Sequence, residues 1–266
     1  MGTGRAADAG PTKEWRHRMA SNPNYCDVTP EIEALAALAL ENSCIDPEDY
    51  VRYDVKRGLR DLNGKGVLAG LTEVSDIVAK KIVDGQELPC DGKLYYRGID
   101  VEQLVGQALK EGRFGFEETA YLLLLGRLPK AAELEDFRRQ LSYYRSLPNN
   151  FVRDVILKAP SQDIMNSLAR SVLNLASYDD RCDDISLPNV MRQCVQLTAL
   201  FPMLSVYGYQ AYNYKSGSSL YIHAPRPELS TAENILSLLR ADSSYSFWEA
   251  HVLDICMILH AAWRRQ

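Results

Sequence analysis

Hydrophobic residues recur every three or four positions over most of the chain, a spacing that is typical of amphipathic helices. The clearest case follows Asp100, which can cap a helix together with Gln103, and Gly112 can end that helix in a left-handed conformation. The apolar face of this predicted helix consists of Val101, Leu104, Val105, Ala108 and Leu109. The pattern therefore predicts a mainly α fold.

Residues 119–125 are apolar almost all round, so this segment should form a buried helix that is too short to cross a bilayer. Other helical faces are expected over residues 30–40, 134–144, 164–175, 190–209, 231–240 and 248–259. Pro202 should kink the fourth of these helices. The last helix has an apolar face formed by Trp248, Val252, Ile255, Cys256 and Leu259. We expect this face, including Trp248, Val252 and Leu259, to lack a covering segment.

A different pattern appears near residues 77–96, where short β-type runs alternate with turn residues. Strands are predicted over residues 77–83, 86–90 and 93–96. Asp84-Gly85 and Asp91-Gly92 would form the two tight turns between them, and Pro89 would restrict its strand to a sheet edge. A small antiparallel β meander beside a large helical body is therefore the only β structure expected.

Composition narrows the functional classes. The 266 residues carry a net charge of -5 and no basic stripe, which gives no reason to expect a nucleic-acid partner. No long apolar span points to a membrane, and residues 1–21 lack the apolar centre of a secretory signal, so we expect a loose leading segment. The six cysteines form no Cys-x-x-Cys pair, so reduced thiols in a cytoplasmic protein are expected, with neither a zinc site nor disulfides.

Two segments carry charged residues that could bind a ligand or take part in catalysis. The loop over residues 57–66 is rich in glycine and cations, so its N–H groups and Arg60 could bind phosphate, although a solvated surface loop explains the same composition. Glu117 and Glu118 are adjacent on a helix and point in different directions, so they cannot grip one reacting atom together. We interpret them as acids that favour a helix N-terminus.

The four histidines do not form a recognisable catalytic set. His17 lies in the leading segment and His223 in a loop, while His251 and His260 lie on the last helix. A single histidine on a helix is more often structural than catalytic. No Ser/His/Asp combination, metal cluster or H-E-x-x-H pattern occurs.

Two ordered motifs nevertheless resemble the large-domain signature of citrate synthases. They are L-Y-Y-R-G-I-D over residues 94–100 and F-E-E-x-A-Y-L-L-L-x-G-x-L-P over residues 116–129. The resemblance implies a partial large helical domain over residues 22–260, after the loose segment 1–21. It also implies an aberrant tail over residues 261–266 and no small catalytic domain in this chain.

The family reaction that this resemblance implies condenses acetyl-CoA with oxaloacetate and water to give citrate and coenzyme A, as in the tricarboxylic acid cycle. The coenzyme A thioester is a substrate, so no separate cofactor is expected, and the family forms homodimers or larger assemblies. Arg60 is the best match to a family arginine that contacts the phosphates of coenzyme A, although its loop differs in length. A 2-methylcitrate synthase that uses propionyl-CoA and a non-catalytic helical fragment are the alternatives.

The resemblance also bears on catalysis. In family members, the segment Leu-x-Leu-His-Ala is followed by Asp or Glu and then by a second histidine, which helps bind oxaloacetate. In this chain the segment ends at His260 and Ala261. Trp263 occupies the position of that second histidine, and His260 would lie near the oxaloacetate site. The family's two catalytic histidines and its aspartate lie in later motifs, so no catalytic residue is expected here and the chain alone should be inactive.

The last residues are typical of a reading-frame error. Residues 262–266 read Ala-Trp-Arg-Arg-Gln, and suitable codons read one base later encode His-Gly-Gly-Gly followed by Asn or Lys. That sequence resembles the family's continuation. Sequencing the gene beyond the His260 codon tests this interpretation, which fails if no other frame encodes such a segment.

Overall fold

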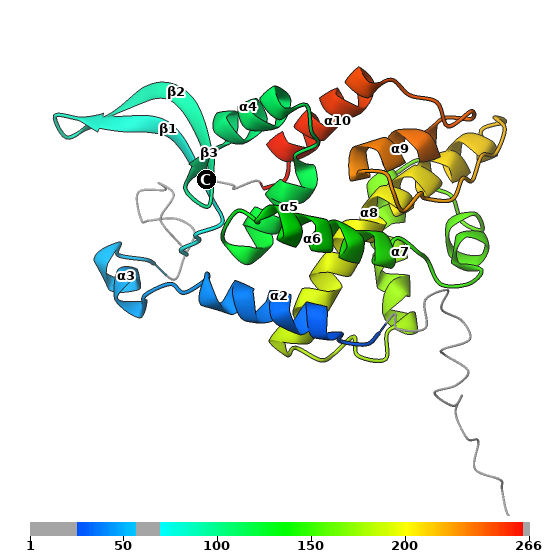
Figure 1. Cartoon of the computed structure of the whole chain (residues 1–266), viewed down its shortest axis with the longest axis horizontal. Helices are drawn as coiled ribbons and strands as arrows, with labels where there is room; N and C mark the ends of the chain where they lie inside the picture. The colour runs from blue at the N-terminus through cyan, green and yellow to red at the C-terminus, as the bar shows by residue number, and fades with distance from the viewer. Residues whose placement is uncertain (1–25, 57–69, 263–266) are drawn as a thin grey trace, which may run out of the picture. The chain divides into compact units, whose positions relative to one another are not determined.

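The computed structural model describes residues 26–56 and 70–262, and this part of the chain is mainly α-helical, as predicted. Figure 1 labels its elements. The helices are α2 (Pro30–Glu41), α3 (Pro47–Arg52), α4 (Val101–Glu111), α5 (Phe116–Leu125), α6 (Ala131–Tyr144), α7 (Ile164–Leu175), α8 (Leu187–Lys215), α9 (Thr231–Leu239) and α10 (Phe247–Leu259). A π-helical turn covers Val152–Ile156 and a 3₁₀ turn covers Ala176–Tyr178. None of the described helices combines the length and apolar character that a membrane span requires.

The chain divides into two compact units, which are described separately. The first unit comprises Met1–Thr29, Gln140–Glu228 and Asn234–Ser244, and the second comprises Pro30–Arg139, Leu229–Glu233 and Tyr245–Gln266. In the first unit, α7, α8 and the π-helical turn pack around Phe151, Leu200, Leu204, Tyr207 and Leu238. α8 passes through Pro202 without a break in the helix.

A buried arginine organises the beginning of α8. The Arg192 side chain is inaccessible to solvent, and its guanidinium lies 2.6 Å from the Asp179 carboxylate. It also donates to the side-chain oxygens of Asn189 and Gln196. Because a buried charge is costly unless it is paired, these three partners account for the presence of an arginine inside this unit.

The second unit contains the predicted β meander, with corrected strand limits. β1 (Ser75–Val83) pairs antiparallel with β2 (Gln86–Tyr96), which pairs with the short β3 (Ile99–Asp100). The turn at Asp84-Gly85 is confirmed, because both residues have positive φ angles, of 51° and 78°. The β1–β2 hairpin and the start of α4 can be followed in Figure 1.

The predicted turn at Asp91-Gly92 is wrong. Both residues lie inside β2, where three residues, Cys90 to Gly92, face the single residue Ala79 of β1. The extra residues form an irregularity in the ladder, as in a β-bulge, so the chain continues without turning back. The second turn falls instead at Arg97-Gly98, whose φ angles are 48° and 79°. β2 is consequently the central strand of the sheet, whereas Pro89 was expected to restrict its strand to an edge. β3 pairs only with Tyr95 and Tyr96 and does not reach Pro89.

The helices that follow the sheet form as predicted. The Asp100 side chain caps α4 by accepting a hydrogen bond from the Glu102 N–H, and Gly112 ends α4 in the left-handed region. The cap forms without the expected capping-box bond from Gln103. α5 is largely buried and ends at Gly126, where φ is 83°. α4, α5, β2 and α10 share an apolar cluster that consists of Tyr96, Val101, Leu104, Leu122 and Ile258.

α10 buries a face other than its apolar one. Trp248 and Val252 of the predicted apolar face are 71% and 60% exposed, and Leu259 is also exposed, so the expectation of an uncovered face is confirmed. The buried residues are Ala250, His251, Asp254 and Ile258. Asp254 turns inward because backbone N–H groups at the start of α5 bind its carboxylate, which an apolar side chain could not do.

Candidate functional site

The candidate site is the carboxyl end of α10, which β2 fixes in place. Tyr96 is the last residue of β2 and has no solvent exposure. Its hydroxyl lies 2.8 Å from the Ile258 carbonyl and 3.3 Å from the Leu259 carbonyl, and it accepts a bond from the Ala262 N–H. These are carbonyls that the end of a helix leaves without intrahelical partners. Burial raises the pKa of the Tyr96 hydroxyl, which therefore remains a neutral donor.

His260 lies directly at this helix end, as the residue that caps α10. Its Nδ1 is 2.7 Å from the Cys256 carbonyl, a contact that requires a proton on Nδ1. In the neutral imidazole Nε2 is then an acceptor, and the side chain is exposed to solvent. A ligand hydroxyl or N–H group could therefore bind at Nε2.

The other residues predicted for this site lie outside the described residues. Arg60 belongs to residues 57–69 and Trp263 to residues 263–266, so the structure does not bring either of them together with His260. The assignments of Arg60 to coenzyme A and of His260 to the oxaloacetate site both stay predictions.

Sequence reasoning missed Arg97, which follows Tyr96 in the turn. Its guanidinium donates to the Leu123 carbonyl of α5 at 3.1 Å and to the Ser43 hydroxyl at 3.0 Å, and it lies 3.6 Å from the Glu73 carboxylate. Gly98 was the available sequence signal, because a glycine between two β-type runs favours a turn, and both Arg97 and Gly98 have positive φ angles. Arg97 joins this turn to α5 and the segment after α2.

Asp254 on α10 is a buried acid with a raised pKa. Its carboxylate accepts hydrogen bonds from the N–H groups of Gly115 at 2.7 Å and Phe116 at 3.1 Å, and the residue is only 1% exposed. Burial raises the pKa of Asp254 to about 6, and the nearby Glu117 carboxylate also raises it. The interaction fixes the start of α5 to the middle of α10. The sequence signal was weak, because it consisted of one acid within an apolar helix.

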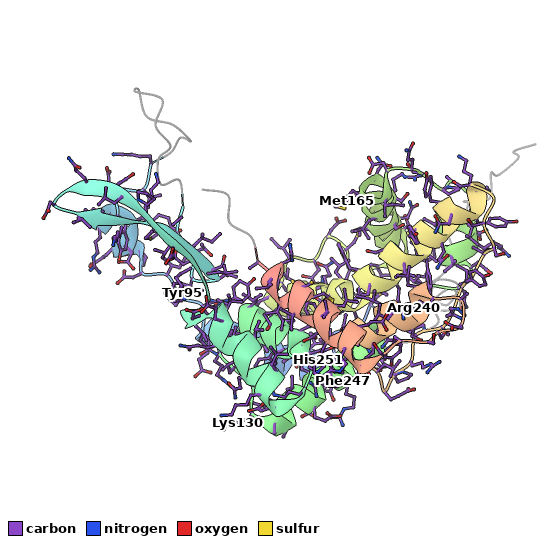
Figure 2. The ribbon with its side chains drawn as sticks, turned by 90° about the horizontal axis from the view of Figure 1, so that it is seen from above. Tyr95, Lys130, Met165, Arg240, Phe247 and His251 are labelled. Carbon is purple, nitrogen blue, oxygen red and sulfur yellow. The ribbon has the colours of Figure 1, made fainter. Side chains whose placement is uncertain are left out.

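His251 lies one turn before Asp254 in an aromatic environment. Its ring stacks on Phe114 with centroids 4.7 Å apart and lies 4.3 Å from Phe247, next to which it is labelled in Figure 2. It is buried, and its Nε2 has no hydrogen-bond partner within residues 26–56 and 70–262. This packing agrees with the structural role expected for His251.

Glu117 and Glu118 point in different directions, as predicted, but the helix N-terminus does not fully account for them. Glu117 is buried and accepts a hydrogen bond from the Thr231 N–H at 2.6 Å, at the start of α9. Glu118 binds the Arg113 guanidinium at 2.8 Å. Glu117 therefore connects two helices, and it is not a surface acid at a helix end.

The described ranges contain no group of three or more His, Cys, Asp or Glu side chains that could hold a metal ion. Together, a mainly α fold, a short antiparallel sheet that contains L-Y-Y-R-G-I-D, and a helix followed by His260 and Ala261 define a helical domain with a small β meander.

A family model described as "Citrate synthase, C-terminal domain" matches residues 60–262. The chain therefore belongs to the citrate synthase family.

Curated relatives support this membership. Citrate synthase of Haloferax volcanii is 29% identical over 214 residues, which cover 78% of this chain and 49% of that protein. Citrate synthase of Acidithiobacillus ferridurans is 31% identical, with 74% and 47% covered. 2-Methylcitrate synthase 2 of Corynebacterium glutamicum is 28% identical, with 70% and 42% covered. The chain thus spans about half the length of the curated relatives it matches.

Solved structures agree on the fold. Citrate synthase from Pyrobaculum aerophilum superimposes with a TM-score of 0.62 at 26% identity, with 77% of this chain and 49% of that chain covered. The ternary complex of Thermoplasma acidophilum citrate synthase with carboxymethyl coenzyme A and oxaloacetate gives a TM-score of 0.60 at 19% identity, with 77% and 47% covered. The second match concerns the fold alone.

Proposed function

We propose that the protein to which these 266 residues belong condenses acetyl-CoA with oxaloacetate and water to give citrate and coenzyme A. The observation that carries this proposal is the family match over residues 60–262, which includes both signature motifs. In the reaction, the methyl carbon of acetyl-CoA loses a proton and attacks the ketone carbon of oxaloacetate. Water then cleaves the thioester and releases the thiol of coenzyme A.

This chain would contribute binding and positioning to that reaction. Tyr96 holds the end of α10, so that the exposed His260 ring lies at a defined place. With both ring nitrogens protonated, its Nε2–H could donate a hydrogen bond to a carboxylate or ketone oxygen of oxaloacetate. Arg60 would bind a phosphate of coenzyme A, since a guanidinium forms paired hydrogen bonds with phosphate oxygens. Proton abstraction and carbonyl polarisation are assigned to the family's later histidine and aspartate motifs.

A 2-methylcitrate synthase is the alternative reaction, because curated relatives of both kinds match this chain at similar identity. The two reactions differ by one methylene in the acyl group, and a hydrophobic pocket discriminates such a difference only about 10- to 200-fold. Measuring thiol release with acetyl-CoA and with propionyl-CoA, both with oxaloacetate, decides between them. Absence of turnover with either thioester in a protein that carries these residues together with the family's later motifs would contradict both.

We also propose that the protein forms a homodimer. Met165 and Leu173 on α7 are each 74% exposed, and they leave apolar surface on a helix of the first unit (Figure 2 labels Met165). Exposed apolar patches commonly mark association surfaces. Light scattering of the purified protein measures the mass directly, and a monomer at micromolar concentration would contradict the proposal.

The cytoplasmic setting stays a prediction from the free cysteines.

A further inference from the structure

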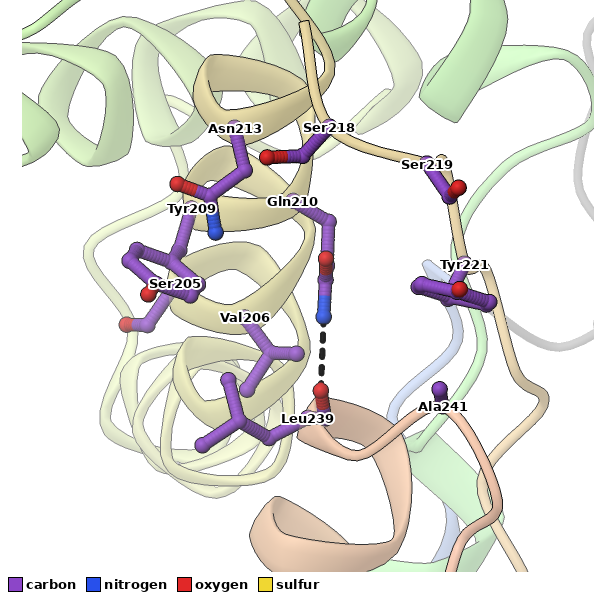
Figure 3. A pocket seen from close by; sticks show the side chains of 10 residues that line it. All are labelled: Ser205, Val206, Tyr209, Gln210, Asn213, Ser218, Ser219, Tyr221, Leu239 and Ala241. Atoms are coloured by element: carbon purple, nitrogen blue, oxygen red, sulfur yellow. Dashed lines mark hydrogen bonds between the residues drawn. The ribbon is translucent and has the colours of Figure 1, made fainter. Parts of the chain in front are cut away.

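A pocket lies in the first unit, whereas the residues assigned to the reaction belong to the second unit. It has a volume of about 550 Å³ and lies between the last turns of α8, the loop that follows and the end of α9 (Figure 3). This volume is within the range of about 300–1,000 Å³ that is usual for small-molecule sites. All of its lining residues belong to the first unit, so the pocket is complete within it.

The lining is uncharged, and most of its residues have a polar group, although apolar atoms form the larger part of its surface. Seven of its ten residues carry a hydroxyl or carboxamide group, and the other three are Val206, Leu239 and Ala241. None of the ten is Asp, Glu, Lys, Arg or His. A phosphate or carboxylate would lose hydration here without meeting an opposite charge, so the lining disfavours charged ligands.

Gln210 supplies a buried hydrogen-bonding group at the centre of the pocket. The residue is 4% exposed, and its Nε2 donates to the Leu239 carbonyl at 2.7 Å, the dashed line in Figure 3. That bond fixes the orientation of the carboxamide. Its oxygen receives no hydrogen bond from the part of the chain that the structure describes, so it can accept one from a ligand.

Aromatic rings stand at the pocket's margin. Figure 3 shows Tyr221, in the loop after α8, across the opening from Gln210, while Tyr209 belongs to α8. Tyr221 is stacked near His223, and the His223 carbonyl accepts a bond from the Tyr207 hydroxyl at 2.6 Å. These contacts hold the loop, so the Tyr221 ring is positioned before a ligand arrives. Asn213 and Ser218 provide further hydrogen-bonding groups on the same rim.

We propose that this pocket binds a neutral, ring-shaped, polyhydroxylated small molecule, of which a sugar is the simplest example. An aromatic ring packs against the C–H face of such a molecule, and oriented amides and hydroxyls bind its hydroxyl groups. The Gln210 oxygen would accept from one hydroxyl and the Asn213 carboxamide would bind a second. The site is independent of the proposed condensation, so its test does not depend on turnover.

The test uses the 266-residue chain with glucose and trehalose as neutral probes and glucose 6-phosphate as the charged comparison. Titration calorimetry and saturation-transfer NMR should show saturable binding of at least one neutral probe, with at least tenfold weaker binding of glucose 6-phosphate. Tyr221→Ala and Asn213→Ala should each weaken binding about tenfold, which corresponds to about 1.4 kcal/mol. Both residues lie at the rim, so the fold should survive, and circular dichroism verifies this.

Tyr214→Ala is the matched control, because Tyr214 is an exposed tyrosine of α8 that does not line the pocket. It should leave the affinity unchanged. Three results would each overturn the proposal: no saturable binding of either neutral probe, equal binding of glucose 6-phosphate, or affinities that neither rim variant alters.

Discussion

At the scale of single residues, Asp254 links the packing of α10 to pH. Its pKa is raised from 3.8 to about 6, so the folded state holds this proton more tightly than the unfolded state does. Between about pH 4 and pH 6 the free energy of unfolding should therefore fall as pH rises. Asp254→Asn should remove this component, so the stability of the variant relative to the parent should increase by on the order of 1–3 kcal/mol from pH 4 to pH 7. Urea unfolding across this range measures it.

Asp242→Asn is the control for that experiment. The Asp242 carboxylate accepts bonds from the Ser244 side chain and N–H, which lower its pKa. The stabilisation that the Asp242 carboxylate provides is complete above its unfolded pKa and is lost as pH falls. The stability of Asp242→Asn relative to the parent should therefore decrease, and not increase, as pH rises. If the two variants show the same trend, the assignment of the pH dependence to Asp254 is wrong.

Arg60 is tested by its effect on one substrate. In a protein that carries these residues together with the family's later motifs, Arg60→Ala should raise the apparent KM for acetyl-CoA about tenfold and leave that for oxaloacetate nearly unchanged. Lys65→Ala, in the same glycine-rich loop, distinguishes a specific phosphate contact from the general charge of the loop. An unchanged KM for acetyl-CoA in Arg60→Ala would remove Arg60 from the site.

At the scale of elements, the junction between α5 and the end of α2 depends on a glycine. A Cβ on Gly126 would lie 2.6 Å from the Asn42 Cβ and 2.8 Å from the Asn42 carbonyl oxygen, and φ is positive. Gly126→Ala should therefore destabilise the protein by about 2–4 kcal/mol, through both backbone strain and overpacking. Gly112→Ala also has positive φ but nothing within 4 Å, so it should cost only about 1 kcal/mol. Equal losses in thermal unfolding would show that the Asn42 contact does not matter.

At the scale of the whole molecule, we expect the 266 residues expressed alone to show no citrate synthase turnover. General acid–base groups each contribute about 10²- to 10⁴-fold, and the family's proton-transferring residues are assigned to motifs that these residues do not include. The uncovered face of α10, with Trp248 and Val252, should also favour association with other chains. Assay with acetyl-CoA and oxaloacetate, together with light scattering, measures both effects. Turnover near ordinary enzyme rates would refute this expectation.

The sequence by itself determined what neighbouring residues control. Asp100 and Gly112 delimit α4, Asp84-Gly85 forms its tight turn, and the two ordered motifs place the chain in its family. Caps, left-handed glycines and helical periodicity act within a few residues, so they can be interpreted without knowledge of the fold.

Only the tertiary structure decided which groups become buried. Asp254 lies inside because it meets the Gly115 N–H 139 positions away, and Glu117 because it meets Thr231 114 positions away. Tertiary packing also leaves Trp248 exposed, although Trp248 belongs to the apolar face of its helix. It keeps Asp91-Gly92 within β2, although these two residues locally favour a turn. A buried polar group is stable only beside its hydrogen-bonding partner, and when that partner is distant in sequence, only the folded chain brings the two together.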